Sequence, residues 1–193
     1  MNATPALFPE ELLATDPVEI PLSSGRQVTV QAWRVAFAAS PDRSSMGLDR
    51  SYAAKPLVMV EKQAMFPEIA CLTLFKKNGW EGVWADQPHR KYFDKMPTQS
   101  KGTSLDTYAN QLITRIAENN DKSKAGCWDL ILWTHRTLLF VAVAVPGRGP
   151  HGIAEGSARW LAACLRTGLS ASQFAIIQWE YRTVVARRKR AHA

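Results

Sequence analysis

The chain has 193 residues, of which 46% are hydrophobic and 21% are charged. This composition is that of an ordinary globular protein and excludes wholesale disorder, and the length suits one domain with a full core. No apolar run is long enough to span a membrane, and the N-terminal residues lack the basic start and apolar stretch of a signal peptide. We therefore expect a cytoplasmic protein that does not contact a membrane.

The charge balance is strongly basic. Lysine and arginine number 24 against 17 aspartate and glutamate residues, which gives a formal net charge of +7. An excess of this size favours a polyanionic partner, most simply nucleic acid, although it also serves general solubility. Part of the excess lies in residues 187–190, a basic run that is expected to strengthen binding without forming a site.

The cysteines and histidines show no spacing typical of a zinc site or a disulfide framework. The three cysteines are predicted to be reduced core residues because each lies among apolar residues: Cys71, Cys127 and Cys164. The four histidines are scattered, and each is interpreted as a surface residue rather than a ligand: His89, His135, His151 and His192.

The first part of the chain predicts strands and helices in mixed order. β-Branched and aromatic residues favour strands, and apolar residues at helical spacing favour helices. One helix is expected to begin at Pro67, because proline is favoured at the first helical position, and to end at Gly79. The elements expected in chain order are an extended lead-in with at most one short helix over 1–25, a strand over 28–37, a loop over 40–55, this helix, a strand over 80–86 and a helix over 103–118.

The most regular pattern lies in the last third of the chain. Strands are predicted over 127–133 and 138–145, and the four residues between them indicate an antiparallel hairpin. A loop rich in glycine and proline, a helix over 157–167 and a strand over 174–181 follow. Because a helix connects them, strand 174–181 is expected to run parallel to strand 138–145.

Two carboxylates stand where the apolar pattern favours an uncharged residue. Glu68 leans toward the buried side of the helix that begins at Pro67, and Asp129 interrupts an apolar strand near its start. Taken singly, a glutamate at a helix N-terminus and a strand-capping aspartate are the simpler explanations. Carboxylates are rarely buried unless they are paired or bind metal, however, and Mg²⁺ and Mn²⁺ prefer oxygen ligands. Together the two residues indicate a metal site.

The segments GCWDLILW, LLFVAVAVPGRGPHG, SARWLAACLRTG and FAIIQW, in this order, resemble the core of the PD-(D/E)XK nucleases, and most closely their VRR-NUC branch. The resemblance covers about the last third of the chain, and Glu68 on the preceding helix extends it. It implies an α/β fold with a restriction-endonuclease-like core, in which helices flank a central mixed β-sheet. It also implies hydrolysis of phosphodiester bonds in DNA with Mg²⁺ or Mn²⁺.

The resemblance assigns the metal-binding carboxylates to Glu68 and Asp129. The Glu-x-Lys pair of the family falls on Ala142, Val143 and Ala144, so a metal ligand and the lysine beside the attacking water are both absent. Only the backbone carbonyl of Val143 could still ligate metal there. Three hypotheses remain: deliberate inactivation of a deoxyribonuclease, a natural pseudonuclease that binds nucleic acid or a partner, and an ordinary buried strand. We favour the first, which predicts that this chain is inactive.

Nucleic-acid contacts are predicted at basic residues, with DNA favoured over RNA. Basic residues interleaved with Trp80, Trp84, Tyr92 and Phe93 suit phosphate neutralisation and base stacking, or else a core flanked by a solvated face. The residues predicted to contact the substrate are Lys76, Lys77, Arg90, Lys91, Arg148 and Arg159.

A single domain is expected, and assembly into a homodimer or larger complex is compatible with it. Its parts are an N-terminal extension with a strand or hairpin over 1–60, a nuclease-like core over 61–182 and a basic tail over 183–193.

Overall fold

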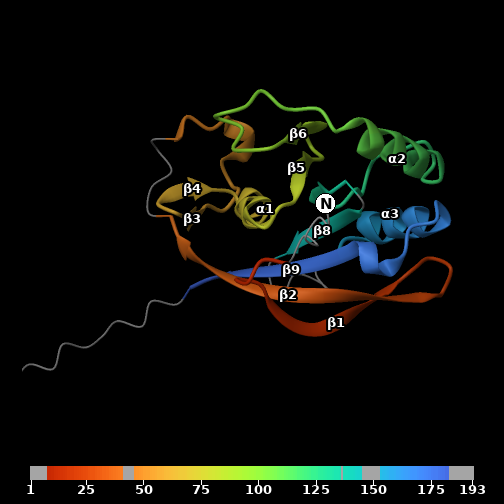
Figure 1. Cartoon of the computed structure of the whole chain (residues 1–193). Coiled ribbons are helices and arrows are strands. Elements are labelled where there is room, and N and C mark those ends of the chain that lie inside the picture. Colours follow the sequence, from red (N-terminus) through yellow and green to blue (C-terminus); the bar gives the residue numbers. More distant parts are fainter. Residues whose placement is uncertain (1–7, 41–45, 136, 145–152, 183–193) are drawn as a thin grey trace, which may run out of the picture.

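The computed structural model describes residues 8–40, 46–135, 137–144 and 153–182. In these residues, nine strands form one mixed sheet, and three α-helices pack on its faces (Figure 1). The predicted α/β class, with helices flanking a central mixed sheet, is therefore confirmed.

The centre of the fold is a helix, an antiparallel three-stranded meander, a second helix and a parallel strand. The predicted hairpin is present as an antiparallel β7–β8 pair, and β5 adds to β7 antiparallel. As expected, β9 runs parallel to β8. The elements of this centre are α1 (Pro67–Lys77), β5 (Glu81–Asp86), β7 (Leu130–Trp133), β8 (Leu138–Ala144), α3 (Glu155–Arg166) and β9 (Phe174–Tyr181).

Further strands extend this centre on both sides. The sheet order is β4-β3-β2-β9-β8-β7-β5-β6, and β1 pairs with β2. Strand β2 is long and runs parallel to β9. Strands β3, β4 and β6 are only three residues long, which is too short for an alternating apolar pattern to be recognised in the sequence. The added elements are β1 (Leu13–Pro21), β2 (Gln27–Ala39), β3 (Val58–Val60), β4 (Gln63–Met65), β6 (Lys91–Phe93) and α2 (Thr107–Glu118).

The N-terminal segment departs from the prediction. Residues 1–25 were expected to be an extended lead-in, but β1 pairs with β2 over most of its length. Its prolines are tolerated because the pairing register shifts between Thr15 and Val18, around Pro17, and because Pro21 ends the strand. Helix α2 also begins later than predicted, because the Asp106 side chain accepts a hydrogen bond from the Ala109 N–H and caps it there.

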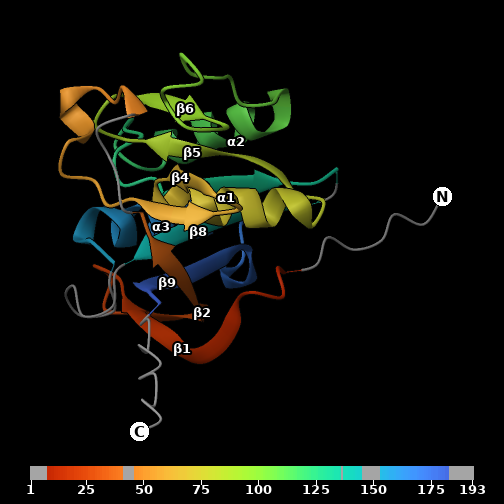
Figure 2. The same cartoon turned by 90° about the vertical axis from the view of Figure 1, so that its left-hand side faces the viewer.

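Helix α1 lies on one face of the central strands, and α2 and α3 lie on the other (Figures 1 and 2). Side chains that alternate along these strands divide the interior into two cores. The α1-side core contains Leu139 and Val141 of β8 together with the buried face of α1. The α3-side core contains Phe140 and Ala142 of β8 together with residues of α2 and α3. A position on β8 therefore determines which helix layer its side chain meets.

The loop before β7 packs tightly on the N-terminus of α3. Gly126 has φ +83°, and a Cβ atom there would lie 2.1 Å from the carbonyl oxygen of Gly156. Two residues later, the indole N–H of Trp128 donates to the carbonyl of Ser157 at 3.1 Å. These contacts fix the backbone that leads directly to Asp129.

We expect Gly126→Ala to destabilise the fold by about 3 kcal/mol or more, because a left-handed residue is strained and a methyl group would overlap backbone. Gly79→Ala is the matched control, since Gly79 has φ +84° and open space around it. That control should cost only about 1–2 kcal/mol. Urea unfolding of both variants measures the difference, and equal losses would contradict the close packing.

Candidate functional site

A cleft of about 190 Å³ lies where the N-terminus of α1, the end of β5 and the residue before β7 meet. The loop that precedes β3 closes it with a short 3-10 helix, η2 (Arg50–Tyr52). Six side chains in its lining can carry charge or transfer protons: Tyr52, Lys55, Glu68, Asp86, His89 and Asp129.

The two carboxylates singled out in the sequence both line this cleft. Glu68 stands in the first turn of α1, where the helix dipole favours a negative charge. Asp129 is held between two strands: its carbonyl accepts from the Ala85 N–H at 2.8 Å, and its Oδ2 accepts from the Val143 N–H at 2.7 Å. The fold thus brings together two residues far apart in the chain, and it uses the N–H of Val143 to orient one of them.

The electrostatics of Glu68 and Asp129 suit a bound cation. Burial, and then the neighbouring Glu68, raise the pKa of Asp129 from its ordinary 3.8 to about 7, against the opposing effects of the Val143 N–H and Lys55. Glu68 Oε2 is buried and has no hydrogen-bond partner among the residues that the structure describes. An unpaired carboxylate oxygen beside a second carboxylate is the chemistry that a divalent ion would satisfy.

Lys55 supplies the positive charge of the cleft. Its Nζ lies 2.5 Å from Glu68 Oε1. The ammonium also lies over the Trp84 ring, 4.9 Å from the centroid, and 5.5 Å from the centroid of Phe66. An ion pair and two aromatic faces hold it in place. In the sequence, Lys55 ends a polar segment that is expected to be a loop, and no local pattern marks it as a functional residue.

Ala142 and Ala144 do not meet the carboxylates. Although both are described, neither lines the cleft. Ala142 is buried in the α3-side core. Ala144 is also buried, and because it lies two residues further along β8, its side chain points to the same face of the sheet. The residues of β8 that face α1 are Leu139, Val141 and Val143. The alternation of valine and alanine is therefore that of a buried strand, and neither alanine lies in the cleft, where the hypothesis of deliberate inactivation requires both.

The basic residues predicted to contact nucleic acid are dispersed. Lys76 donates to the carbonyl of Asp94, and Lys77 pairs with Glu61, both at the far end of α1 from Glu68. Arg159 is exposed on α3, which packs on the other face of the sheet. The remaining three are Arg90 and Lys91, both exposed beside His89, and Arg148, which lies outside the described residues.

The interleaved aromatic residues are mostly core residues. Trp80, Trp84 and Phe93 are buried in the α1-side core, and Tyr92 packs against the α3-side core. Base stacking on these rings is therefore not supported, and the alternative reading of core aromatics between solvated charges fits.

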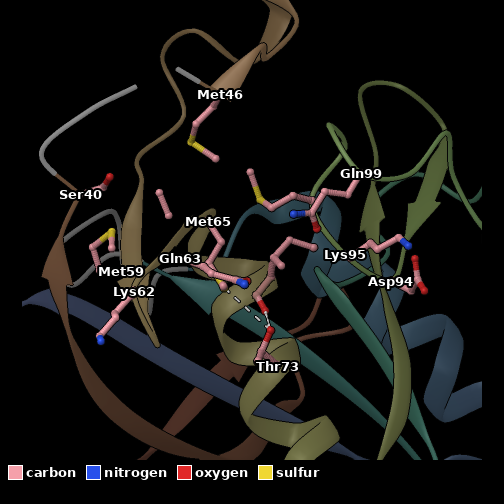
Figure 3. A pocket seen from close by; sticks show the side chains of 13 residues that line it. Ser40, Met46, Met59, Lys62, Gln63, Met65, Thr73, Asp94, Lys95 and Gln99 are labelled. Carbon is pink, nitrogen blue, oxygen red and sulfur yellow. Dashed lines mark hydrogen bonds between the residues drawn. The ribbon is translucent and has the colours of Figure 1, made fainter. Parts of the chain in front are cut away.

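A second hollow, of about 490 Å³, lies beside α1 and the β3–β4 hairpin (Figure 3). Four methionines contribute to its lining. The sulfur of Met65 accepts from the Thr73 hydroxyl at 3.8 Å, and the sulfur of Met96 accepts from the Phe66 N–H at 3.3 Å. Because it lacks a paired set of carboxylates, this hollow offers less chemistry than the smaller cleft.

Comparisons with protein-family models, curated proteins and solved structures give no match to this chain. In the described residues, no cluster of three or more His, Cys, Asp and Glu side chains could hold a metal. Within the same residues, no helix combines the length and apolar character needed to cross a bilayer.

The raised pKa of Asp129 predicts a pH-dependent stability of the metal-free protein. Because the folded state binds this proton more tightly than the unfolded state, the contribution is fully present below about pH 4 and is lost as pH rises to about 7. Its size is at most about 4 kcal/mol. As pH rises from about 4 to about 7, we expect the free energy of unfolding of the Asp129→Asn variant to increase relative to that of the unchanged chain. Urea unfolding in the presence of a chelator measures this difference. A constant difference between pH 4 and pH 8 would contradict the burial of this carboxylate.

Proposed function

We propose that the chain is a metal-dependent nuclease that hydrolyses phosphodiester bonds of DNA in the cleft formed by Glu68, Asp129 and Lys55. The observation that carries this proposal is the convergence of two acidic side chains and one basic side chain from three separate segments. The unpaired Glu68 Oε2 and the net charge of +7 support it further.

Glu68 and Asp129 are the residues that would hold Mg²⁺ or Mn²⁺. Magnesium is commonly bound through one or two carboxylates, with water and substrate phosphate completing its coordination, so two protein ligands suffice. When bound, such an ion lowers the pKa of water and neutralises phosphate charge. The Val143 N–H keeps the Asp129 carboxylate in one orientation. The site therefore does not need the carbonyl of Val143 as a ligand.

Lys55 takes the part that the family resemblance gives to a lysine at position 144. Its ammonium is fixed by Glu68 and by the faces of Trp84 and Phe66 before any substrate arrives. A preorganised cation stabilises the negative charge that develops on the phosphate during attack. Since this lysine comes from another segment, an alanine at position 144 does not imply an inactive chain.

The alternative is a non-catalytic module that binds nucleic acid or a protein partner. Net positive charge supports binding equally well without any chemistry. The two proposals differ in one respect, since only the nuclease changes the covalent structure of its ligand.

The test is incubation of the purified chain with linear duplex, branched and single-stranded DNA, and with RNA, in Mg²⁺, Mn²⁺ or EDTA. We expect cleavage of DNA with either metal and none with EDTA. Cleavage of RNA alone would move the substrate class to RNA. Binding that weakens with salt, with no cleavage of any substrate by the folded protein, would leave the binding module as the function.

A further inference from the structure

Three hydrogen-bonded residues on the wall of the cleft are not used by the proposed metal site. The Tyr52 hydroxyl donates to Asp86 Oδ2 at 2.5 Å, and His89 Nδ1 lies 2.7 Å from the same oxygen. Asp86 is 2% exposed, whereas the His89 side chain is 31% exposed. A buried carboxylate thus anchors a histidine that solvent and ligands can reach.

The β5–β6 hairpin creates this arrangement. Asp86 is the last residue of β5, and in the antiparallel register it lies opposite Lys91, the first residue of β6. The four residues between them form the turn, in which Arg90 adopts the left-handed conformation with φ 54°. The turn brings His89 back over Asp86, and the rings of His89 and Tyr52 contact each other with centroids 4.7 Å apart. The imidazole is therefore held by a hydrogen bond and by a ring contact.

The position of His89 links two hollows. It lines the cleft of Glu68 and Asp129, and it also lines a hollow of about 600 Å³ to which Lys91 and Lys101 contribute. With Nδ1 engaged by Asp86, Nε2 is the ring nitrogen left to act on a ligand. Asp49 also lines this second hollow, and its Oδ1 accepts hydrogen bonds from the N–H and the hydroxyl of Ser51.

We propose that His89 is the general acid of the cleft, that Asp86 is its positioning residue, and that the substrate is a phosphodiester with an alkoxide leaving group. This inference rests on the proposed nuclease function. A carboxylate on one ring nitrogen fixes the tautomer and orientation of an imidazole so that the other nitrogen transfers the proton. Lys55, Glu68 and Asp129 come from the loop before β3, from α1 and from the residue before β7, whereas His89 comes from the β5–β6 turn.

The step balances as a hydrolysis. The oxygen of a water molecule forms a bond to phosphorus, and its proton passes to solvent. The bond from phosphorus to the deoxyribose oxygen breaks, and that oxygen takes the electron pair together with the proton from His89 Nε2. His89 then regains a proton from solvent. No oxidant, reductant or further reactant is required.

The leaving group provides the test. A deoxyribose alkoxide is strongly basic and needs a proton as it leaves, whereas 4-nitrophenolate leaves without one. We expect His89→Gln to slow metal-dependent cleavage of DNA by about 10²-fold or more. The same variant should cleave the 4-nitrophenyl ester of thymidine 5′-phosphate within a few-fold of the unchanged chain. This second substrate also shows that the variant is folded and loaded with metal.

Two further variants sharpen the result. Asp86→Asn should give a smaller loss with the same dependence on the leaving group, because the histidine remains but its orientation is less fixed. His135→Gln is the matched control, since His135 is an exposed histidine outside the cleft, and it should cleave both substrates normally. Equal slowing of both substrates by His89→Gln, or slowing of neither, overturns the inference while leaving the nuclease in place. Failure of the unchanged chain to cleave either substrate overturns both.

Discussion

Asp129→Asn is expected to reduce metal-dependent cleavage of DNA by about 10³-fold, because removing a metal ligand forfeits several kcal/mol of transition-state stabilisation. Asparagine keeps an oxygen that can accept from the Val143 N–H, so the backbone contact that orients residue 129 is preserved. Glu68→Gln should give a loss of similar size. Cleavage rates at saturating Mn²⁺ measure both effects.

A matched control lies in the turn between β3 and β4. Glu61→Gln removes a carboxylate that also pairs with a lysine, Lys77, but on the exposed surface outside the cleft. It should leave cleavage unchanged, because exposed ion pairs contribute little to stability and neither residue of this pair lines the cleft. Cleavage that survives Asp129→Asn would show that the reaction occurs elsewhere.

Lys55→Met is expected to reduce the rate of cleavage by about 10²–10³-fold, because a preorganised cation at the phosphate is removed. Methionine retains much of the aliphatic length that packs near Trp84 and Phe66. Affinity for Mn²⁺ should not fall, and it should rise modestly, since the ammonium repels the ion and competes for Glu68 Oε1. Steady-state rates and Mn²⁺ titrations separate the two effects.

Lys77→Met provides the corresponding control, since it removes a lysine that is also paired with a glutamate but lies outside the cleft. Its rate and metal affinity should match those of the unchanged chain. A purely structural role for Lys55 would lower thermal stability and metal affinity together and would leave the rate per folded, metal-loaded molecule intact. That outcome would remove Lys55 from the proposed mechanism.

The central elements were predictable because their apolar patterns match their burial. β7, β8, α3 and β9 all lie where the sequence placed them, and the short hairpin connection and the helical crossover gave the directions of their pairing. Glu68 and Asp129 stood out for the same reason, since charge in an apolar pattern is costly and calls for a partner.

The rest of the cleft carries no comparable signal. Lys55 stands in an irregular loop, and its approach to Glu68 depends on how that loop crosses the N-terminus of α1. His89 looked like a scattered surface histidine, because the β5–β6 turn that folds it over Asp86 is visible only once β6 is known. The two alanines of β8 were placed at the site by motif spacing alone, whereas the face that each side chain takes is set by the register of β8 in the sheet.

Calorimetric titration of Mn²⁺ into the purified chain at pH 8 is the most direct test of a divalent-ion site between Glu68 and Asp129. We expect one ion per chain if the proposed site is correct, with binding abolished in both Asp129→Asn and Glu68→Gln and retained in Glu61→Gln. Binding should also weaken at pH 5, because the raised pKa of Asp129 leaves that carboxyl protonated there. Absence of binding to the unchanged chain, or equal binding to the Asp129→Asn variant, would contradict the proposed site.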